Sequence, residues 1–376
     1  MFFIVFVVFV VGVRHTLHLQ RKRKQKQKQK QQQKQTKNQN QKMKIPNYKI
    51  IFSILIPIIF SFSILKSTDS KKWGFYGHKR INRIAIFTLP PEMLGFYKDH
   101  IEFITDHAVD PDKRRYAVEG EAQRHYIDID HYKIGLEDVF KIVPKYWNDA
   151  VTKYTEDTLQ KYGIVPWHIQ TMKYRLQKAF EEKNVDLILK YSAEIGHYIG
   201  DAHVPLHTTE NYNGQLTNQK GIHGLWESRL VELNADTYDY FIGKSVYISK
   251  INDFVWEAVQ SSHIALDSVF KLEKEVTLDF PPDNKYSFES KGNTTIQVYS
   301  IEFCQEYNKR MNGMVERRLR KAILAVGSIW FTAWVDAGQP DLLKLRSILP
   351  SEDLLNEQKE LNQSKHSKSH LERSCD

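Results

Sequence analysis

Histidines and carboxylates recur at a four-residue spacing in the middle of the chain. His197 and Asp201 stand four apart, His207 follows six residues later, and His223 and Glu227 repeat the spacing of four. Residues four apart lie on one face of a helix, so each pair can direct two donor groups at one point. Imidazole and carboxylate groups suit zinc, and three protein ligands leave a position for water. Because five donors lie so close in the chain, the stretch predicts a site for more than one metal ion.

Further candidate ligands precede this stretch. His78 falls in the first turn of a predicted helix whose apolar residues follow helical spacing and which ends before two prolines. His125 lies in an acidic region that begins with an Asp-Pro-Asp turn, and this turn supplies Asp110 and Asp112. The turn brings both carboxylates within two residues, so either Asp110 or Asp112 is a candidate ligand.

The elements that must position these residues are helical. Apolar residues at three- and four-residue intervals, with Gly and Pro as stops, predict helices. The periodic residues cover 146–159, before Gly163, and 172–180, after Pro166, and further helices fall at about 184–204, 221–234, 251–275 and 296–337. Residues 276–296 are turn-rich and are expected to form a loop, and no run of alternating strands is convincing. The pattern predicts an all-α protein: a single multi-helix domain with long loops around a buried metal site.

The net charge of +9 arises in one segment near the N-terminus. Residues 14–49 contain 13 Lys and Arg and no Asp or Glu, so the rest of the chain is mildly acidic. Overall charge therefore indicates no nucleic-acid-binding surface. The two cysteines, Cys304 and Cys375, are too few and too far apart for a disulfide framework or thiolate metal ligands.

Residues 1–72 are expected to be a leader. A Lys/Gln run before Met43 cannot form a core and should be disordered, and from Met43 a basic, then apolar, then polar pattern is typical of a secretory signal peptide. An uncleaved anchor is the alternative, because no good small-residue cleavage site follows. We expect residues 73–345 to form the functional domain, 346–376 a disordered tail, and the protein to be secreted, periplasmic or membrane-anchored facing outside.

The order of the candidate ligands resembles the metal-site signature of a known superfamily. The signature comprises W-x4-H, D-x14-H, H-x3-D-x5-H and H-x3-E, and its residues here are Trp73, His78, Asp110, His125, His197, Asp201, His207, His223 and Glu227. It is similar in order and spacing to that of the superfamily joining bacterial zinc-dependent phospholipase C to the single-strand-specific nucleases. The resemblance extends from Trp73 to about Leu230.

The resemblance implies three zinc ions in an all-α domain. One would be held by Asp110, His125, His197 and Asp201, a second by His207, His223 and Glu227, and the third by His78, Asp201 and the amino nitrogen and carbonyl oxygen of Trp73. Asp201 would then bridge two ions, and Asp110 and Asp201 would be the carboxylates of the catalytic centre. Lys71 and Lys72 precede Trp73, and if they are retained the chelating amine is lost and two zinc ions are expected.

The reaction that the resemblance implies is hydrolysis of a phosphate ester by a metal-activated water. Glu227 as the last ligand favours phospholipase C-like cleavage of a phosphodiester in a phospholipid head group. The alternative is a single-strand-specific nuclease or 3'-nucleotidase acting on nucleic acid or nucleotides, since nucleases of the superfamily more often carry Asp at this position. No obligate protein partner is evident. A non-catalytic zinc-binding surface protein is the alternative from another class, and the complete ligand set argues against it.

Overall fold

The computed structural model describes residues 75–115, 117–135, 137–291 and 294–363. Trp73, the expected leader and the last 13 positions, 364–376, lie outside these residues. Within them no helix combines the length and apolarity that a bilayer crossing requires. The helices are α3 Phe75–Ala85, α4 Pro91–Asp99, α5 Ile101–Asp106, α6 Asp110–Arg114, α7 Val139–Ile142, α8 Trp147–Tyr154, α9 Glu156–Tyr162, α10 Val165–Glu181, α11 Val185–Ala202, α12 Leu230–Asn234, α13 Ile251–Asp279, α14 Ile301–Arg310, α15 Met314–Asp336 and α16 Glu352–Gln363. The domain is all-α, as the sequence predicted.

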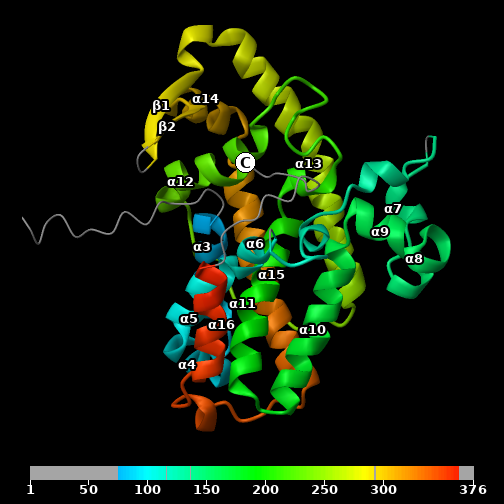
Figure 1. Ribbon diagram of the computed structural model, residues 1–376, viewed down its shortest axis with the longest axis vertical. Helices are drawn as coiled ribbons and strands as arrows, with labels where there is room; N and C mark the ends of the chain where they lie inside the picture. The colour runs from blue at the N-terminus through cyan, green and yellow to red at the C-terminus, as the bar shows by residue number, and fades with distance from the viewer. Residues whose placement is uncertain (1–74, 116, 136, 292–293, 364–376) are drawn as a thin grey trace, which may run out of the picture. The chain divides into compact units, whose positions relative to one another are not determined.

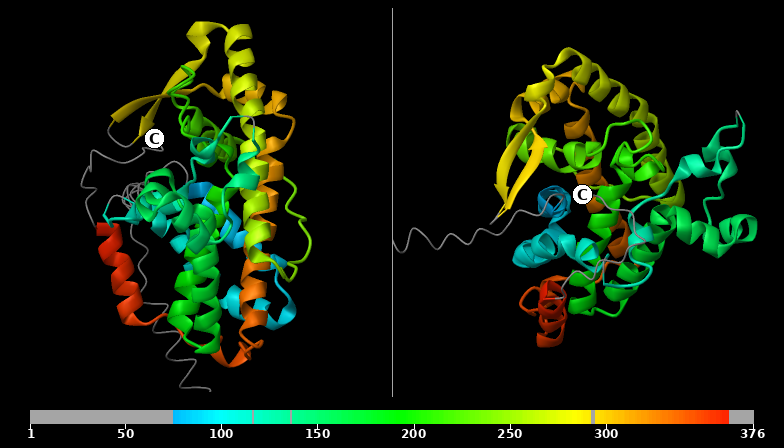
Figure 2. Two further views of the ribbon diagram at one scale, coloured as in Figure 1. Left: turned by 90° about the vertical axis from the view of Figure 1, so that its right-hand side faces the viewer. Right: turned by 45° about the horizontal axis from the view of Figure 1, so that its top comes forward.

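Helix α11 lies at the centre of the helical core. It packs against α10, α15 and α3, as Figures 1 and 2 show. The side chain of Asn184 caps its first turn by accepting a hydrogen bond from the backbone N–H of Leu187 at 3.1 Å. Its last turns are buried on every side, which is the pattern of a core helix rather than a surface helix. Pro205 stands just beyond its end. These last turns carry His197 and Asp201.

Helix α15 contributes the aromatic part of the core. The indole N–H of the fully buried Trp330 donates to the backbone carbonyl of Ser192 on α11 at 3.1 Å. Its ring also stacks on that of Tyr97, with ring centroids 4.9 Å apart. The sequence predicted one helix over residues 296–337, but the chain breaks between α14 and α15. Asn312 and Gly313 adopt positive φ angles of 48° and 73° there, a conformation that ends a helix.

Residues 276–296 were expected to form a loop, and they are more regular than that. Helix α13 continues to Asp279, and a β-hairpin follows, with strands β1 Tyr286–Lys291 and β2 Thr294–Tyr299. The strands pair antiparallel, with Tyr286 opposite Tyr299. Strand β2 is rich in Thr, Ile, Val and Tyr, which favour strands. The hairpin lies at the edge of the helices in Figure 2.

The C-terminal region was expected to be disordered from residue 346, but residues 352–363 form α16. Leu354 and Gln358, one helical turn apart, are both buried. The Asp186 carboxylate accepts a hydrogen bond from the N–H of Ser351 at 2.9 Å. Figure 1 shows α16 beside the helices of the N-terminal half, where it contacts α6. One buried face of this segment, of mixed polarity, is thus sufficient for a helix once a folded surface is available to cover it.

Candidate metal centre

Histidines and carboxylates from well-separated segments converge in the interior. Each group brings its potential ligand atoms within 4.8 Å of one another. The first group is Asp112, His125 and His197; the second is His207, His223 and Glu227; the third is His78, His197 and Asp201. Every histidine of the implied zinc signature is therefore in one of the groups.

The first group lies where α6, the turn before residue 126 and α11 meet. His125 Nδ1 and His197 Nε2 are 3.0 Å apart. Asp112 Oδ1 lies 3.5 Å from His197 Nε2 and 3.8 Å from His125 Nδ1. Asp201, one helical turn after His197, places Oδ2 at 3.0 Å from His125 Nδ1 and 3.3 Å from His197 Nε2. These four side chains surround one point.

The second group is built from the segment after α11 and from a π-helical turn. His207 lies in a 3₁₀ turn, and Glu227 lies in the π-helix Gly224–Arg229 that precedes α12. The Nε2 atoms of His207 and His223 are 3.1 Å apart, and Glu227 Oε2 is 3.2 Å from the former and 2.8 Å from the latter. The π-helix is a rare geometry that occurs mostly at functional sites. It is the local structure that presents Glu227.

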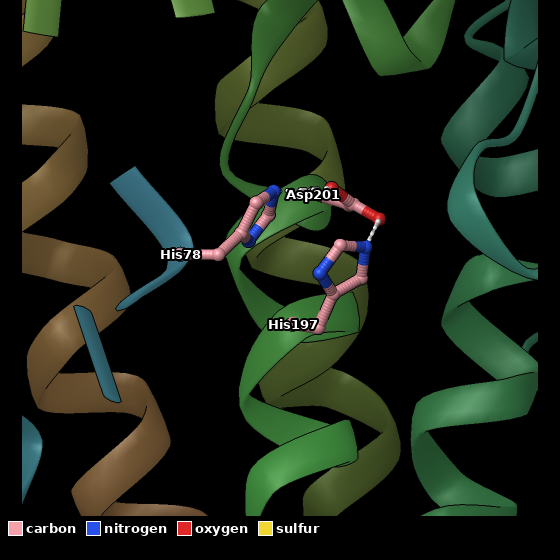
Figure 3. Close-up of side chains that lie close together, drawn as sticks. All are labelled: His78, His197 and Asp201. Atoms are coloured by element: carbon pink, nitrogen blue, oxygen red, sulfur yellow. Dashed lines mark ion pairs between the residues drawn. The ribbon is translucent and has the colours of Figure 1, made fainter. Parts of the chain in front are cut away.

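The third group places His78 against α11. The His78 and His197 rings stack with centroids 3.9 Å apart, and Figure 3 shows both rings beside Asp201. A Cβ atom added at Gly200 would lie 2.9 Å from His78 Nδ1, so only glycine leaves room for this ring. His78 Nε2 is 3.4 Å from Asp201 Oδ1 and 3.3 Å from Glu227 Oε1. Trp73, the remaining implied ligand of this position, lies outside the described residues.

Two carboxylates connect the groups. Asp201 directs Oδ2 at His125 and His197 and Oδ1 at His78, with His207 Nε2 at 4.0 Å from Oδ1. Glu227 directs Oε1 at His78 and Oε2 at the second group. The three groups therefore form one continuous cluster and not three independent sites.

Backbone carbonyls determine which ring nitrogens face the cluster. His197 Nδ1 donates to the carbonyl of Ala108 at 2.9 Å, and His207 Nδ1 donates to the carbonyl of His125 at 2.6 Å. A carbonyl only accepts, so the proton of each neutral ring is on Nδ1 and the Nε2 lone pair is directed inward. This is the arrangement that metal-binding histidines need.

The carboxylates of the cluster remain ionised. Burial acts to raise the pKa of Asp201, but its interactions with His197, His207 and His125 outweigh burial and hold the pKa well below its usual value. The pKa of Glu227 is likewise held well below its usual value, and the pKa of Asp112 is lowered to about 2, against burial in both cases, by neighbouring histidines. The site thus concentrates negative charge in a buried place.

The donor set fits bound divalent cations. Asp201 Oδ1 is buried without a hydrogen-bond partner, which costs free energy unless a cation binds there. In the first group two ring nitrogens face each other at 3.0 Å, and two lone pairs repel unless a proton or a metal ion lies between them. The nitrogen and oxygen donors are those that zinc prefers.

Asp110 is where the structure departs from the implied ligand set. Its buried carboxylate accepts hydrogen bonds from His107 at 2.7 Å and Lys113 at 2.8 Å, and it belongs to none of the three groups. Asp110 has helical angles, and Pro111 lies in the first turn of α6, where proline is tolerated. Two residues on, the helix directs Asp112 to a different side, and Asp112 is the carboxylate that reaches the cluster.

Replacing each of these two carboxylates separately by asparagine tests which one is the metal ligand. Asp112→Asn should lower zinc affinity and hydrolytic activity by roughly 10- to 100-fold, because it removes a charge directed at His125 and His197. Asp110→Asn makes the same chemical change two residues away and should leave the zinc content unchanged. Zinc content by mass spectrometry and activity at saturating zinc measure both. If Asp110→Asn loses the metal and Asp112→Asn keeps it, the assignment reverses.

Sequence reasoning overlooked Glu121, a fully buried carboxylate beside His125. It stands four residues before His125, the same spacing that marks the ligand pairs, so this signal was present. The carboxylate of Asp130, also near the cluster in sequence, accepts hydrogen bonds from the Thr209 hydroxyl at 2.6 Å and the Glu210 N–H at 3.1 Å. It anchors the segment after His207.

Comparison with known proteins gives a match to one sequence family and a similarity to a solved structure. The family described as S1/P1 nuclease matches residues 73–324. Among solved structures, the alpha-toxin of Clostridium perfringens, from an avian strain, aligns with 14% identity and a TM-score of 0.43 over 72% of this chain and 65% of that chain. No curated protein matches the chain.

Proposed function

Because the chain belongs to the S1/P1 nuclease family and is a phosphodiesterase-type hydrolase, we propose that it is a zinc-dependent enzyme that cleaves single-stranded nucleic acid or nucleotides. The proposal places the enzyme outside the cytoplasm, because the sequence from Met43 has the pattern of a signal peptide. The proposed ligands are His78, Asp112, His125, His197, Asp201, His207, His223 and Glu227, with Trp73 as a further ligand if it becomes the N-terminal residue.

One observation carries this proposal: ionised carboxylates and inward-facing histidines form a continuous buried cluster linked by Asp201. Burying so many ionisable groups costs free energy unless cations compensate them. Ionisable groups whose pKa values are strongly shifted in this way gather mostly at functional sites. This supports a catalytic centre rather than a surface protein that has lost its activity.

The residues of the cluster would divide the work by position. When bound, zinc would lower the pKa of a water molecule and neutralise charge on the phosphate. Asp201, with an oxygen toward each side of the cluster, would hold the two sides at a fixed separation. Asp112 and Glu227 keep some exposure, with 24% and 14% of their side chains accessible, whereas the histidines are buried. The exposed edge therefore marks the side from which a phosphate would enter.

The substrate class rests on the family match and on one aromatic neighbour. Tyr212 is half-buried beside the cluster, with its ring centroid 6.2 Å from that of His223. Aromatic rings near a phosphate site provide a stacking surface for a base. A second candidate, phospholipase C-like hydrolysis of a phospholipid head group, is favoured by a different observation, the glutamate at position 227. Cleavage of single-stranded nucleic acid and cleavage of a phospholipid head group both break a phosphodiester bond.

Paired assays on one preparation test the proposal. The purified protein should cleave single-stranded DNA or RNA, lose activity on treatment with a zinc chelator, and regain it when zinc is restored. Phosphatidylcholine vesicles provide the comparison substrate. Cleavage of the lipid alone would establish the second candidate, and no cleavage of either substrate at full zinc occupancy would establish a non-catalytic zinc-binding protein. Activity that persists without metal would exclude zinc chemistry.

A further inference from the structure

Behind His125 lies a buried charged residue that the proposed metal centre does not account for. Glu121 is fully buried, in the turn between α6 and the 3₁₀ segment Ala122–His125. A buried carboxylate is costly unless its oxygens are satisfied. Its contacts therefore indicate what it is retained for.

Both oxygens of Glu121 have partners, and the two sets of partners differ. Oε2 accepts hydrogen bonds from the guanidinium groups of Arg124 at 2.7 Å and Arg114 at 3.4 Å. Oε1 accepts a short hydrogen bond from the Tyr198 hydroxyl, and it lies 3.8 Å from His125 Nε2. One oxygen is thus fixed by arginines, and the other faces the outer nitrogen of a proposed metal ligand.

The geometry of His125 gives this contact its meaning. Its Nδ1 faces the first group, at 3.0 Å from Asp201 Oδ2, so the opposite nitrogen, Nε2, must carry the proton when Nδ1 is to bind a cation. Nε2 is buried and has no hydrogen-bond partner. The carboxylate of Glu121, with Oε1 3.8 Å from Nε2, is the acidic group on that side of the ring. Tyr198 follows His197 directly in α11. Glu121 therefore contacts His125 itself and the residue next to His197.

We propose that Glu121 is a positioning residue that holds His125 with Nε2 protonated and Nδ1 directed at the first group. The inference rests on the proposed function, because it assumes that the cluster binds zinc. Carboxylates behind metal-binding histidines fix the ring orientation and raise the basicity of the ligand nitrogen. Arg114 and Arg124 keep Glu121 in place, and Tyr198 limits its rotation.

The chain offers a matched control for the test. Glu194 is a second buried carboxylate, and it accepts a hydrogen bond from Arg114 at 2.7 Å, the same arginine that contacts Glu121. Glu121→Gln and Glu194→Gln therefore both remove a buried negative charge from Arg114, but only Glu121→Gln changes the group that faces His125. Zinc affinity is measured on the full folded protein by competition with a chromophoric chelator, and thermal stability is measured without metal.

The expected result is a difference in zinc affinity between the two variants. Glu121→Gln should weaken zinc binding about 10- to 100-fold, whereas Glu194→Gln should stay within about threefold of the parent. If Glu121→Gln does not fold, Tyr198→Phe replaces it, since loss of the hydroxyl frees Oε1 and should weaken zinc binding severalfold. Equal affinities in the parent and in the tested variant, or equal losses in Glu121→Gln and Glu194→Gln, would overturn the inference.

The same measurement separates this inference from the proposed function. A parent protein that binds no zinc would remove the metal centre itself, and the role of Glu121 would fall with it. A parent protein that binds zinc tightly, together with a Glu121→Gln variant of equal affinity, would remove only the positioning role. Cobalt(II) substituted for zinc provides a second readout: its visible spectrum should change in Glu121→Gln and stay unchanged in Glu194→Gln.

Discussion

Replacing Asp201 by asparagine should reduce phosphodiester hydrolysis by more than about 100-fold, since even partners outside the ligand shell contribute roughly 10- to 100-fold. The physical reason is its position. Its two oxygens face His125 and His197 on one side and His78 on the other. An asparagine keeps the size of the side chain but loses the charge and one acceptor oxygen. The zinc content measured by mass spectrometry should therefore fall by more than one ion per chain.

Asp186→Asn is the matched control for this prediction. It makes the same chemical change in the first turn of the same helix, where the carboxylate accepts a hydrogen bond from Ser351. Its zinc content and activity should equal those of the parent. An Asp201→Asn protein that keeps its full zinc content, with activity within about threefold of the parent, would contradict the central place given to Asp201 in the cluster.

Replacing Gly163 by alanine should destabilise the domain by roughly 3–5 kcal/mol, the sum expected for a backbone conformation reserved to glycine and for a steric overlap. Gly163 has φ 89° and ψ 148°. An added Cβ would lie 2.2 Å from the carbonyl oxygen of Tyr126. That oxygen cannot easily move, because it accepts a hydrogen bond from Val165, and Ile127 N–H donates to the carbonyl of His207. The overlap should also displace His125 and weaken zinc binding.

Gly120→Ala separates the two causes. Gly120 also has a positive φ, 79°, but an added Cβ would meet nothing within 4 Å. Gly120→Ala should lower the free energy of unfolding by about 1–2 kcal/mol, the cost of a positive φ for alanine alone. Urea unfolding of the metal-free proteins measures both variants, since bound zinc would mask part of the difference. Equal losses of stability in the two variants would show that the contact with Tyr126 is unimportant.

The exchange of Asp110 for Asp112 shows where the spacing of residues stops being informative. The sequence placed two carboxylates in one turn, and the D-x14-H spacing of the family signature favoured Asp110. A helical turn sends residues two apart to opposite sides, so only the packing of α6 against α11 decides which one reaches His197. The Asp110 carboxylate instead accepts hydrogen bonds from His107 and Lys113.

Some parts of the fold were predicted from the sequence and others were not. Helices α10, α11 and α13 follow from apolar residues at helical intervals, because each helix is specified by its own pattern. The break at Gly313 has a local cause, the positive φ angles of Asn312 and Gly313, whereas the burial of α16 depends on residues distant in the chain. Leu354 is buried only because the N-terminal half provides a surface for α16.

What the sequence determined by itself was the helical class, the family resemblance, and the candidate pairs His197/Asp201 and His223/Glu227, since residues at a spacing of four share a helical face wherever the helix lies. The other candidate histidines followed from the resemblance. What the tertiary structure decided was which side chains from different helices meet. The convergence of Asp112, His125 and His197 is of this kind. Direction and burial depend on the packing of whole helices, and no local pattern in the chain encodes them.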